Sequence, residues 1–179
     1  MHRLFVAIRP PEDIRDLLVD AMDDNPELRW VGDENLHLTL RFIGEVERPV
    51  AEDIAAALRN VRAAAFELSL SGVGIFEQRN GGALWAGILP KEPVAALAVK
   101  VERACIAAGL GAEHRAFHPH ITIARWNRRS AVAAQSFLER NRALALSPFF
   151  VDAFTLFESR LSRHGPHYEE LDEYRLTGL

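Results

Sequence analysis

Two short stretches of the chain alternate polar and aliphatic residues so strictly that they predict strands with one polar face. Residues 37–40 read His-Leu-Thr-Leu, and residues 120–123 read His-Ile-Thr-Ile. Successive side chains of a strand point to opposite faces, so each His shares a face with the Thr two positions later. The chain is therefore expected to contain two strands that each carry an imidazole and a hydroxyl over an apolar back.

This repetition exceeds what composition alone produces. The chain has 179 residues with 7 His, and four Thr can be counted along it. Random placement of these residues gives about 0.16 His-x-Thr matches, so two matches in the same aliphatic frame argue for a shared purpose. The alternative is a pair of ordinary buried strands whose polar faces are capped by loops.

Length and charge limit what the chain can be. A chain of 179 residues supports one sizeable core and is short for two independent domains, so we expect a single domain over residues 1–179, built from two closely packed lobes. The formal net charge of −4 argues against non-specific coating of nucleic acid but permits a local basic cleft. The lone Cys105 excludes an intramolecular disulfide and is expected in the core.

The N-terminal segment and the lengths of the apolar runs predict a cytoplasmic protein without a membrane segment. Residues 4–8 are apolar but are followed by Arg9 and Pro10, too soon for a signal peptide. No apolar run approaches the length of a transmembrane helix.

Periodicity predicts a mixed α+β fold. We expect helices over residues 12–22, 50–63, 93–108 and 131–141, where apolar residues recur at helical spacing. We expect strands over residues 4–8, 36–43, 66–75, 83–89, 117–124, 149–158 and 168–176. The strand and helix order around residue 37 returns loosely around residue 120, which favours a bilobal arrangement of two pseudo-symmetric antiparallel-sheet lobes, with helices outside and a central cleft.

The paired motifs suit proton transfer at a phosphate. Histidine has an ordinary pKa of about 6.5, so one imidazole can accept a proton from water while the other gives one to a departing oxygen. His37 and His120 are the candidate acid and base, and Thr39 and Thr122 are candidate donors to the non-bridging phosphate oxygens. Opening a cyclic phosphodiester needs these two proton transfers, and the scheme requires no metal or other cofactor.

The longer strings around the motifs resemble a known family. Residues 37–46 (HLTLRFIGEV) and 117–125 (FHPHITIAR) are similar to the paired signatures of the 2H phosphoesterase superfamily. Within it, the chain most resembles the RNA 2′,3′-cyclic phosphodiesterase family, also called 2′-5′ RNA ligase-like. The similarity extends over nearly the whole chain and includes residues 4–8, 83–87, 156–159 and 165–168.

The resemblance implies a bilobal α+β fold and a specific reaction. Members of the family hydrolyse the 2′,3′-cyclic phosphate of RNA ends to a 2′-phosphomonoester. By this resemblance His37 is the proton donor to O3′, His120 activates water, and Thr39 and Thr122 hold the phosphate. The expected partners are RNA ends or nucleotides with a 2′,3′-cyclic phosphate. We expect the protein itself to be a monomer.

The resemblance also implies that Phe42 and Arg125 contact the nucleotide. Strand parity argues against this, because both positions fall on the opposite face from the motif His and Thr unless a bulge turns the strand. Arg41 has the parity of His37 and is an alternative cation for the phosphate.

The sequence also permits other interpretations. His118 and His120 have metal-ligand spacing with His114 as the obvious third ligand, although His118 is more simply expected to support the turn at Pro119. Trp85 is expected in the core. The functional alternatives are a non-catalytic module that binds RNA ends or nucleotides, or a related enzyme for another cyclic phosphate or a 2′-5′ linkage.

Overall fold

The computed structural model describes residues 1–177, and within them the α+β class is confirmed. Its helices are α1 (Glu12–Ala21), α2 (Arg48–Leu58), α3 (Glu92–Ala107) and α4 (Ala131–Asn141), with short 3-10 turns η1 (Asp33–Asn35) and η2 (Arg128–Ser130). Its strands are β1 (His2–Ile8), β2 (Arg29–Trp30), β3 (Leu38–Val46), β4 (Phe66–Gln78), β5 (Gly81–Leu89), β6 (His120–Asn127), β7 (Phe149–Val151), β8 (Ala153–Ser162) and β9 (Gly165–Arg175).

The strands form a curled sheet of two halves that meet at one point. The order is β7-β4-β5-β6-β3-β1-β8-β9, with β2 added to β6, and all of the pairs are antiparallel. The two halves are joined through β3 and β6, where the paired residues are Leu38 and Ile121. The two strands predicted from the His-x-Thr motifs are therefore neighbours at the centre of the sheet.

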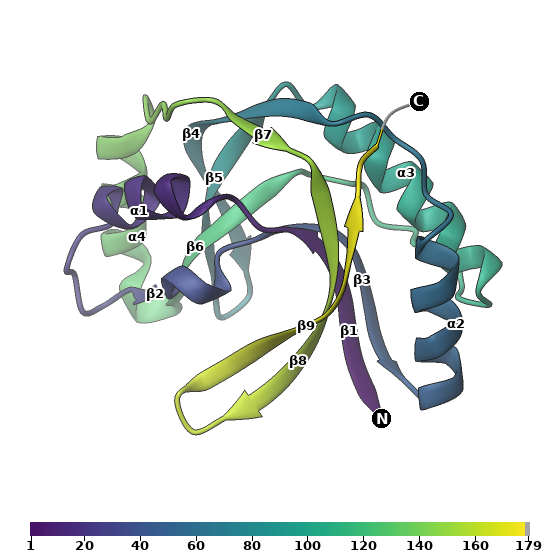
Figure 1. Ribbon diagram of the computed structural model, residues 1–179. Helices are drawn as coiled ribbons and strands as arrows, with labels where there is room; N and C mark the ends of the chain where they lie inside the picture. Colours follow the sequence, from purple (N-terminus) through teal and green to yellow (C-terminus); the bar gives the residue numbers. More distant parts are fainter. Residues whose placement is uncertain (178–179) are drawn as a thin grey trace.

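Each half of the sheet carries two helices on its outer face. Helices α2 and α3 pack on each other and on β1 and β3, whereas α4 packs on β4, β5 and β6. Figure 1 shows α2 and α3 at one side of the curled sheet, and α1 and α4 at the other. We call the side of the sheet under the helices the helix face and the other side the open face. The expected two lobes with outer helices are thus present.

The lobes do not correspond to the two halves of the sequence. Strand β1 and the hairpin of β8 and β9 come from opposite ends of the chain and lie beside β3 in one lobe. Helix α3 follows β5 of the second lobe but packs with α2 on the first. The chain crosses repeatedly between the lobes, so both depend on one continuous core.

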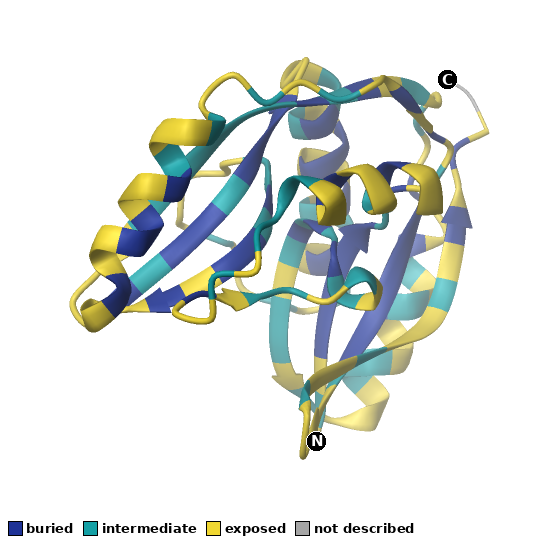
Figure 2. Ribbon diagram, turned by 90° about the vertical axis from the view of Figure 1, so that its left-hand side faces the viewer, coloured by how far each residue is buried: buried dark blue, intermediate teal, exposed yellow. Residues whose placement is uncertain are grey.

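That core lies between the helices and the helix face. The helices bury one stripe of apolar residues each, as the colours of Figure 2 show, whereas β1 and β8 each bury five consecutive residues. Cys105 is fully buried there, as expected, and burial raises the pKa of its thiol to about 11. A smaller cluster of Phe5, Ala7 and Phe157 with Tyr168 lies on the open face.

Most predicted elements are confirmed, with shifted ends. Helix α2 begins at Arg48 and ends at Leu58, earlier than expected, and β4 continues to Gln78. The strand expected over residues 149–158 is two strands separated at Asp152, because β7 pairs with β4 while β8 pairs with β1. In the part of the chain that the structure describes, none of the helices is both long and apolar enough to span a membrane.

Candidate active site

The four motif residues meet on the open face where the lobes join. The pairing of Leu38 with Ile121 is antiparallel, so extending its register by one residue in each direction places His37 beside Thr122 and Thr39 beside His120. All four side chains point away from Leu38 and Ile121, which are buried on the helix face. One strand pair thus collects two imidazoles and two hydroxyls related by an approximate two-fold axis.

Both histidines are held in the same way. Nδ1 of His37 lies 2.7 Å from the carbonyl oxygen of Asn35, and Nδ1 of His120 lies 2.5 Å from that of His118. A carbonyl only accepts, so each Nδ1 carries the hydrogen and donates it two residues back along the chain. In each ring Nε2 is therefore the nitrogen that can accept a proton.

Aromatic side chains fix the planes of the two rings. His37 contacts Phe5 and Tyr168, with ring centroids 4.9 and 5.2 Å away. His120 lies edge-on to Phe76, with the ring centroids 4.9 Å apart, and 5.9 Å from Trp85. The rings are thus preorganised by packing as well as by hydrogen bonds.

Burial lowers the pKa of both histidines. Desolvation is the largest cause for His37, and the charges of Arg9, His120 and Arg125 act in the same direction, against the hydrogen bond to Asn35. Desolvation also dominates for His120, with smaller contributions from His118 and Arg125. Both rings are therefore neutral near pH 7, and an anionic ligand between them restores charge to one of them.

Two bulges decide which other side chains reach this face. In β3 the pairing with β1 steps from Thr39 to Arg41, which skips Leu40, and in β6 the pairing with β5 steps from Thr122 to Ala124, which skips Ile123. Each extra residue reverses the alternation of the strand beyond it. Each motif is thus followed by a bulge three residues after its His.

Phe42 and Arg125 are consequently turned to the open face. Phe42 pairs with Phe5, which contacts His37, and it is 40% exposed under the guanidinium of Arg3. Arg125 is exposed, and its charge acts on His37, His120 and Tyr168. The prediction from strict strand alternation, which placed both residues on the opposite face, was therefore wrong. Each stands five positions after its motif His, so the two are equivalent under the approximate two-fold axis.

Arg41 is not the phosphate-side cation that uninterrupted parity suggested. Its side chain is only 10% exposed and lies on the helix face, with Nε 2.5 Å from a carboxylate oxygen of Glu102. It also donates to the carbonyl of Gly111 at 2.7 Å and lies 3.4 Å from Glu113. The bulge at Leu40 turns Arg41 toward α3, where it anchors the loop that leads to β6.

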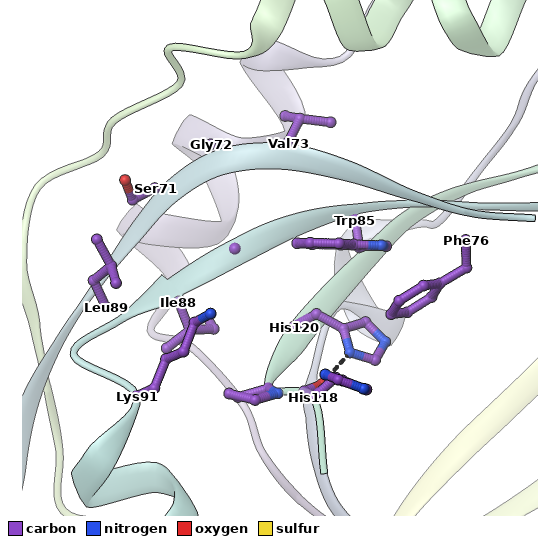
Figure 3. A pocket seen from close by; sticks show the side chains of 12 residues that line it. Ser71, Gly72, Val73, Phe76, Trp85, Ile88, Leu89, Lys91, His118 and His120 are labelled. Carbon is purple, nitrogen blue, oxygen red and sulfur yellow. Dashed lines mark hydrogen bonds between the residues drawn. The ribbon is translucent and has the colours of Figure 1, made fainter. Parts of the chain in front are cut away.

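A cavity of about 310 Å³ opens beside His120. Its walls include Phe76, Trp85, Lys91 and His118, as Figure 3 shows. Gly87, which pairs with His120 across β5 and β6, contributes no side chain to fill this space. The cavity therefore gives access to one of the two rings from the open face.

Trp85 lines this cavity instead of lying in the core, contrary to expectation. It pairs with Thr122 on the open face and is only partly buried. Its indole rests flat on Gly74 of β4, where a Cβ would come within 2.1 Å of the ring. Its Nε1 is buried without a hydrogen-bond partner among the described residues 1–177. The other side of the ring borders the cavity and is a surface on which a planar group can stack.

Sequence reasoning also missed the contact of Tyr168 with His37, since nothing local in the sequence brings β9 to β3. Burial raises the pKa of Tyr168, so its hydroxyl remains a donor at neutral pH. The backbone carbonyl of His118 accepts from Nδ1 of His120, and its exposed side chain lines the cavity. Among residues 1–177, no three His, Cys, Asp or Glu side chains gather as metal ligands, so the His114 and His118 set is not formed.

Comparison with known proteins places this arrangement in context. The model of the 2′-5′ RNA ligase superfamily matches residues 9–163. A protein of Aeropyrum pernix named RNA 2′,3′-cyclic phosphodiesterase is 34% identical over 151 residues, covering 83% of this chain and 86% of its own. A protein of the same name from Thermus thermophilus is 33% identical, covering 98% of this chain and 91% of its own.

Solved structures share the fold over the whole length. The crystal structure of Escherichia coli LigT in apo form superposes with a TM-score of 0.80 at 27% identity, covering 98% of both chains. A crystal structure of TT0787 from Thermus thermophilus has a TM-score of 0.76 at 28% identity, again covering 98% of both chains. LigT has also been crystallised with 3′-AMP and with phosphate.

Proposed function

Because the chain belongs to the 2′-5′ RNA ligase superfamily, we propose that it hydrolyses 2′,3′-cyclic phosphates at RNA or nucleotide ends to 2′-phosphomonoesters. The observation that carries this proposal is the meeting of two imidazoles and two hydroxyls across the pairing of Leu38 with Ile121. The names of the relatives from Aeropyrum pernix and Thermus thermophilus support the same substrate class.

The reaction balances with the side chains of this site. A water attacks phosphorus and gives its proton to Nε2 of His120 while the new P–O bond forms. The P–O3′ bond breaks on the opposite side, and Nε2 of His37 gives its proton to O3′. The products are a 2′-phosphomonoester and a 3′-hydroxyl, and the two histidines exchange protons with solvent before the next turnover. This scheme uses no metal.

Charge on the phosphate is stabilised by the remaining groups. The hydroxyls of Thr39 and Thr122 donate to the two non-bridging oxygens, one from each strand. Arg125 supplies a positive charge on the same face, since it already acts on both rings. Such donors are each worth about 2.7–4 kcal/mol in a water-excluded site. Phe42 presents a half-exposed ring to the nucleoside.

The surroundings of the two rings support the assignment of their roles. The cavity lies against His120, so a water has room beside its Nε2. His37 is enclosed by Phe5 and Tyr168, which suits a group that protonates a bound oxygen. Burial lowers the pKa of His37, so its protonated form depends on the anionic phosphate, and binding therefore charges the acid.

The test is to incubate the protein with 2′,3′-cyclic AMP and to identify the position of the phosphate in the product. We expect 2′-AMP, undiminished by chelator. His37→Ala and His120→Ala should each lower kcat by about 10²–10⁴-fold, while His114→Ala, at an exposed histidine outside the site, should not. Unchanged turnover in either motif variant, or saturable binding with no product, would contradict the proposal.

A further inference from the structure

We propose that single-stranded RNA upstream of the cyclic phosphate binds along the distal end of β1, β8 and β9, on the open face. This inference rests on the proposed function and extends it by stating that a polynucleotide end is preferred over a mononucleotide. We call this surface the outer track; it is formed by Arg3 of β1, by Leu161, Pro166 and Tyr168 of the β8–β9 hairpin, and by Arg163 in the turn at the tip of that hairpin.

The direction of the RNA follows from the chemistry of the ribose. In an in-line displacement the attacking and leaving oxygens lie on opposite sides of phosphorus. O3′ therefore lies on the side of His37, away from the cavity beside His120. Its carbon, C3′, is bonded to C4′, which carries C5′ and the phosphodiester of the preceding nucleotide. The strand therefore leaves the site past His37, toward Tyr168 and the β8–β9 hairpin.

The hairpin extends from the body on this side. Beyond the last pairing of β1 with β8, at Leu4 and Glu158, the hairpin continues as a two-stranded arm, visible in Figure 1. Asn35 ties the arm to the active site, because its side-chain amide donates to the carbonyl of Pro166 at 3.0 Å. The carbonyl of the same residue accepts from His37.

The two faces of the arm differ in chemistry. Tyr168 contacts His37 and faces the open side, and strand alternation places Pro166 on the same side, with Leu161 as its pairing partner. Leu161 is 89% exposed. The ion pairs of Arg160 with Glu158 and Glu169 lie on the other side. The side that continues the active site is thus apolar and aromatic, as expected for a surface that stacks bases.

Cations free of carboxylates flank this apolar strip. The segment 159–168 contains two Arg and two His and no acidic residue, in a chain whose net charge is −4. Among residues 1–177 neither Arg3 nor Arg163 forms an ion pair. Arg3 instead lies 5.6 Å above the ring of Phe42. Stacking surfaces interleaved with unpaired cations are the usual way to bind single strands without reading their sequence.

The test compares two substrates, 2′,3′-cyclic AMP and a single-stranded oligonucleotide with a cyclic-phosphate end. The wild type should have the higher kcat/KM for the oligonucleotide. Arg163→Glu should lower the ratio of kcat/KM for the oligonucleotide to kcat/KM for 2′,3′-cyclic AMP by about tenfold. A plot of log kcat/KM for the oligonucleotide against log salt concentration should also become less steep, by about 0.7 per lost phosphate contact. Arg163→Lys, which keeps the charge, should retain most of the ratio.

The matched control is Arg103→Glu, an equal charge reversal at an exposed position of α3 on the helix face. It should leave the ratio unchanged. A ratio that falls equally in Arg163→Glu and Arg103→Glu, or that is insensitive to both, would overturn the outer track. Failure of the wild type to open either substrate would instead contradict the proposed function, so the two failures are distinguishable. Leu161→Ser, at a site too exposed to affect folding, should lower the ratio independently of charge.

Discussion

Replacing Gly74 by Ala tests whether the backbone of β4 sets the position of Trp85 beside the candidate active site. The indole lies on Gly74 so closely that a Cβ there would be 2.1 Å from Cζ2 and 2.3 Å from Cη2 of the ring. Gly74 pairs directly with Trp85 across β4 and β5. The added methyl group therefore has to displace the indole, the strand, or both.

The cost follows from the kind of contact. Forcing one methyl group into a packed site costs about 1–3 kcal/mol. For a chain of this length each kcal/mol corresponds to about 2–4 °C, so Tm should fall by about 2–12 °C. The displaced indole lines the cavity next to His120, and a misplacement of ~1 Å near reacting groups can cost about 100-fold, so kcat/KM should fall by about ten- to a hundredfold.

The assay is thermal denaturation together with turnover of 2′,3′-cyclic AMP, and the control is Gly111→Ala. In the described part of the chain, a Cβ at Gly111 has no atom within 4 Å beyond its chain neighbours, so this variant should match the wild type in both measurements. In a Trp85→Ala background the Gly74→Ala change should lower the free energy of unfolding by less than about 0.5 kcal/mol, because the indole that the methyl group would clash with is absent. Equal costs of Gly74→Ala with and without the indole would refute the steric reasoning.

Three further predictions concern charge in the site. The kcat/KM for 2′,3′-cyclic AMP should peak below pH 6.5, because burial lowers the pKa of both His37 and His120 and turnover needs one ring charged and one neutral; an optimum above pH 6.5 would contradict this. The free energy of unfolding should decline as pH falls below about 6.5, because histidines of the unfolded chain bind protons there while buried His37 does not. Urea titrations should show a smaller decline for His37→Gln. If the free energy of unfolding depends on pH equally in the variant and the wild type, His37 is not the cause. Arg125→Ala should lower kcat/KM by about 10²-fold, with part of the loss recovered in Arg125→Lys; full activity of Arg125→Ala would remove it from the site.

The alternation of the motifs was sufficient to predict which side chains share the open face. His37 directly precedes β3 and lies two residues before Thr39, and His120 lies two residues before Thr122 in β6, with no bulge inside either pair. Their meeting was expected from the repetition of the motif. The local pairing that achieves it, between Leu38 and Ile121, depends on a contact between distant segments.

The alternation failed beyond the motifs because strand register depends on neighbouring strands. In β6 the bulge is visible in the sequence pattern, because Ile123 and Ala124 are two consecutive buried residues and Arg125 after them lies on the open face. In β3 the bulge is concealed, because Arg41 is buried by pairing with Glu102 while Phe42 is exposed. There hydropathy suggests the reverse of the true orientation, and only the partner of Arg41 on α3 resolves it.

The approximate two-fold axis explains both why the histidines resemble each other and how they come to differ. Each donates from Nδ1 to the carbonyl two residues earlier, and each is followed by a Thr and a bulge. These local features give both rings the same tautomer and the same reactive nitrogen, so they cannot assign one as acid and the other as base.

The assignment must therefore come from the strands outside the central pair, where the symmetry breaks. Ala7 of β1 stands beside Thr39, whereas the equivalent neighbour of Thr122 is Trp85 of β5. Gly87 stands beside His120 and leaves a cavity there, while Arg9 follows β1 at the other end of the pair and adds its charge near His37. An open cavity at one ring and an enclosed cationic setting at the other make the two equivalent groups unequal. A Cβ at Gly87 would clash with the backbone oxygen of Ser71 in β4, so the packing of β4 on β5 excludes any side chain that could close the space beside His120.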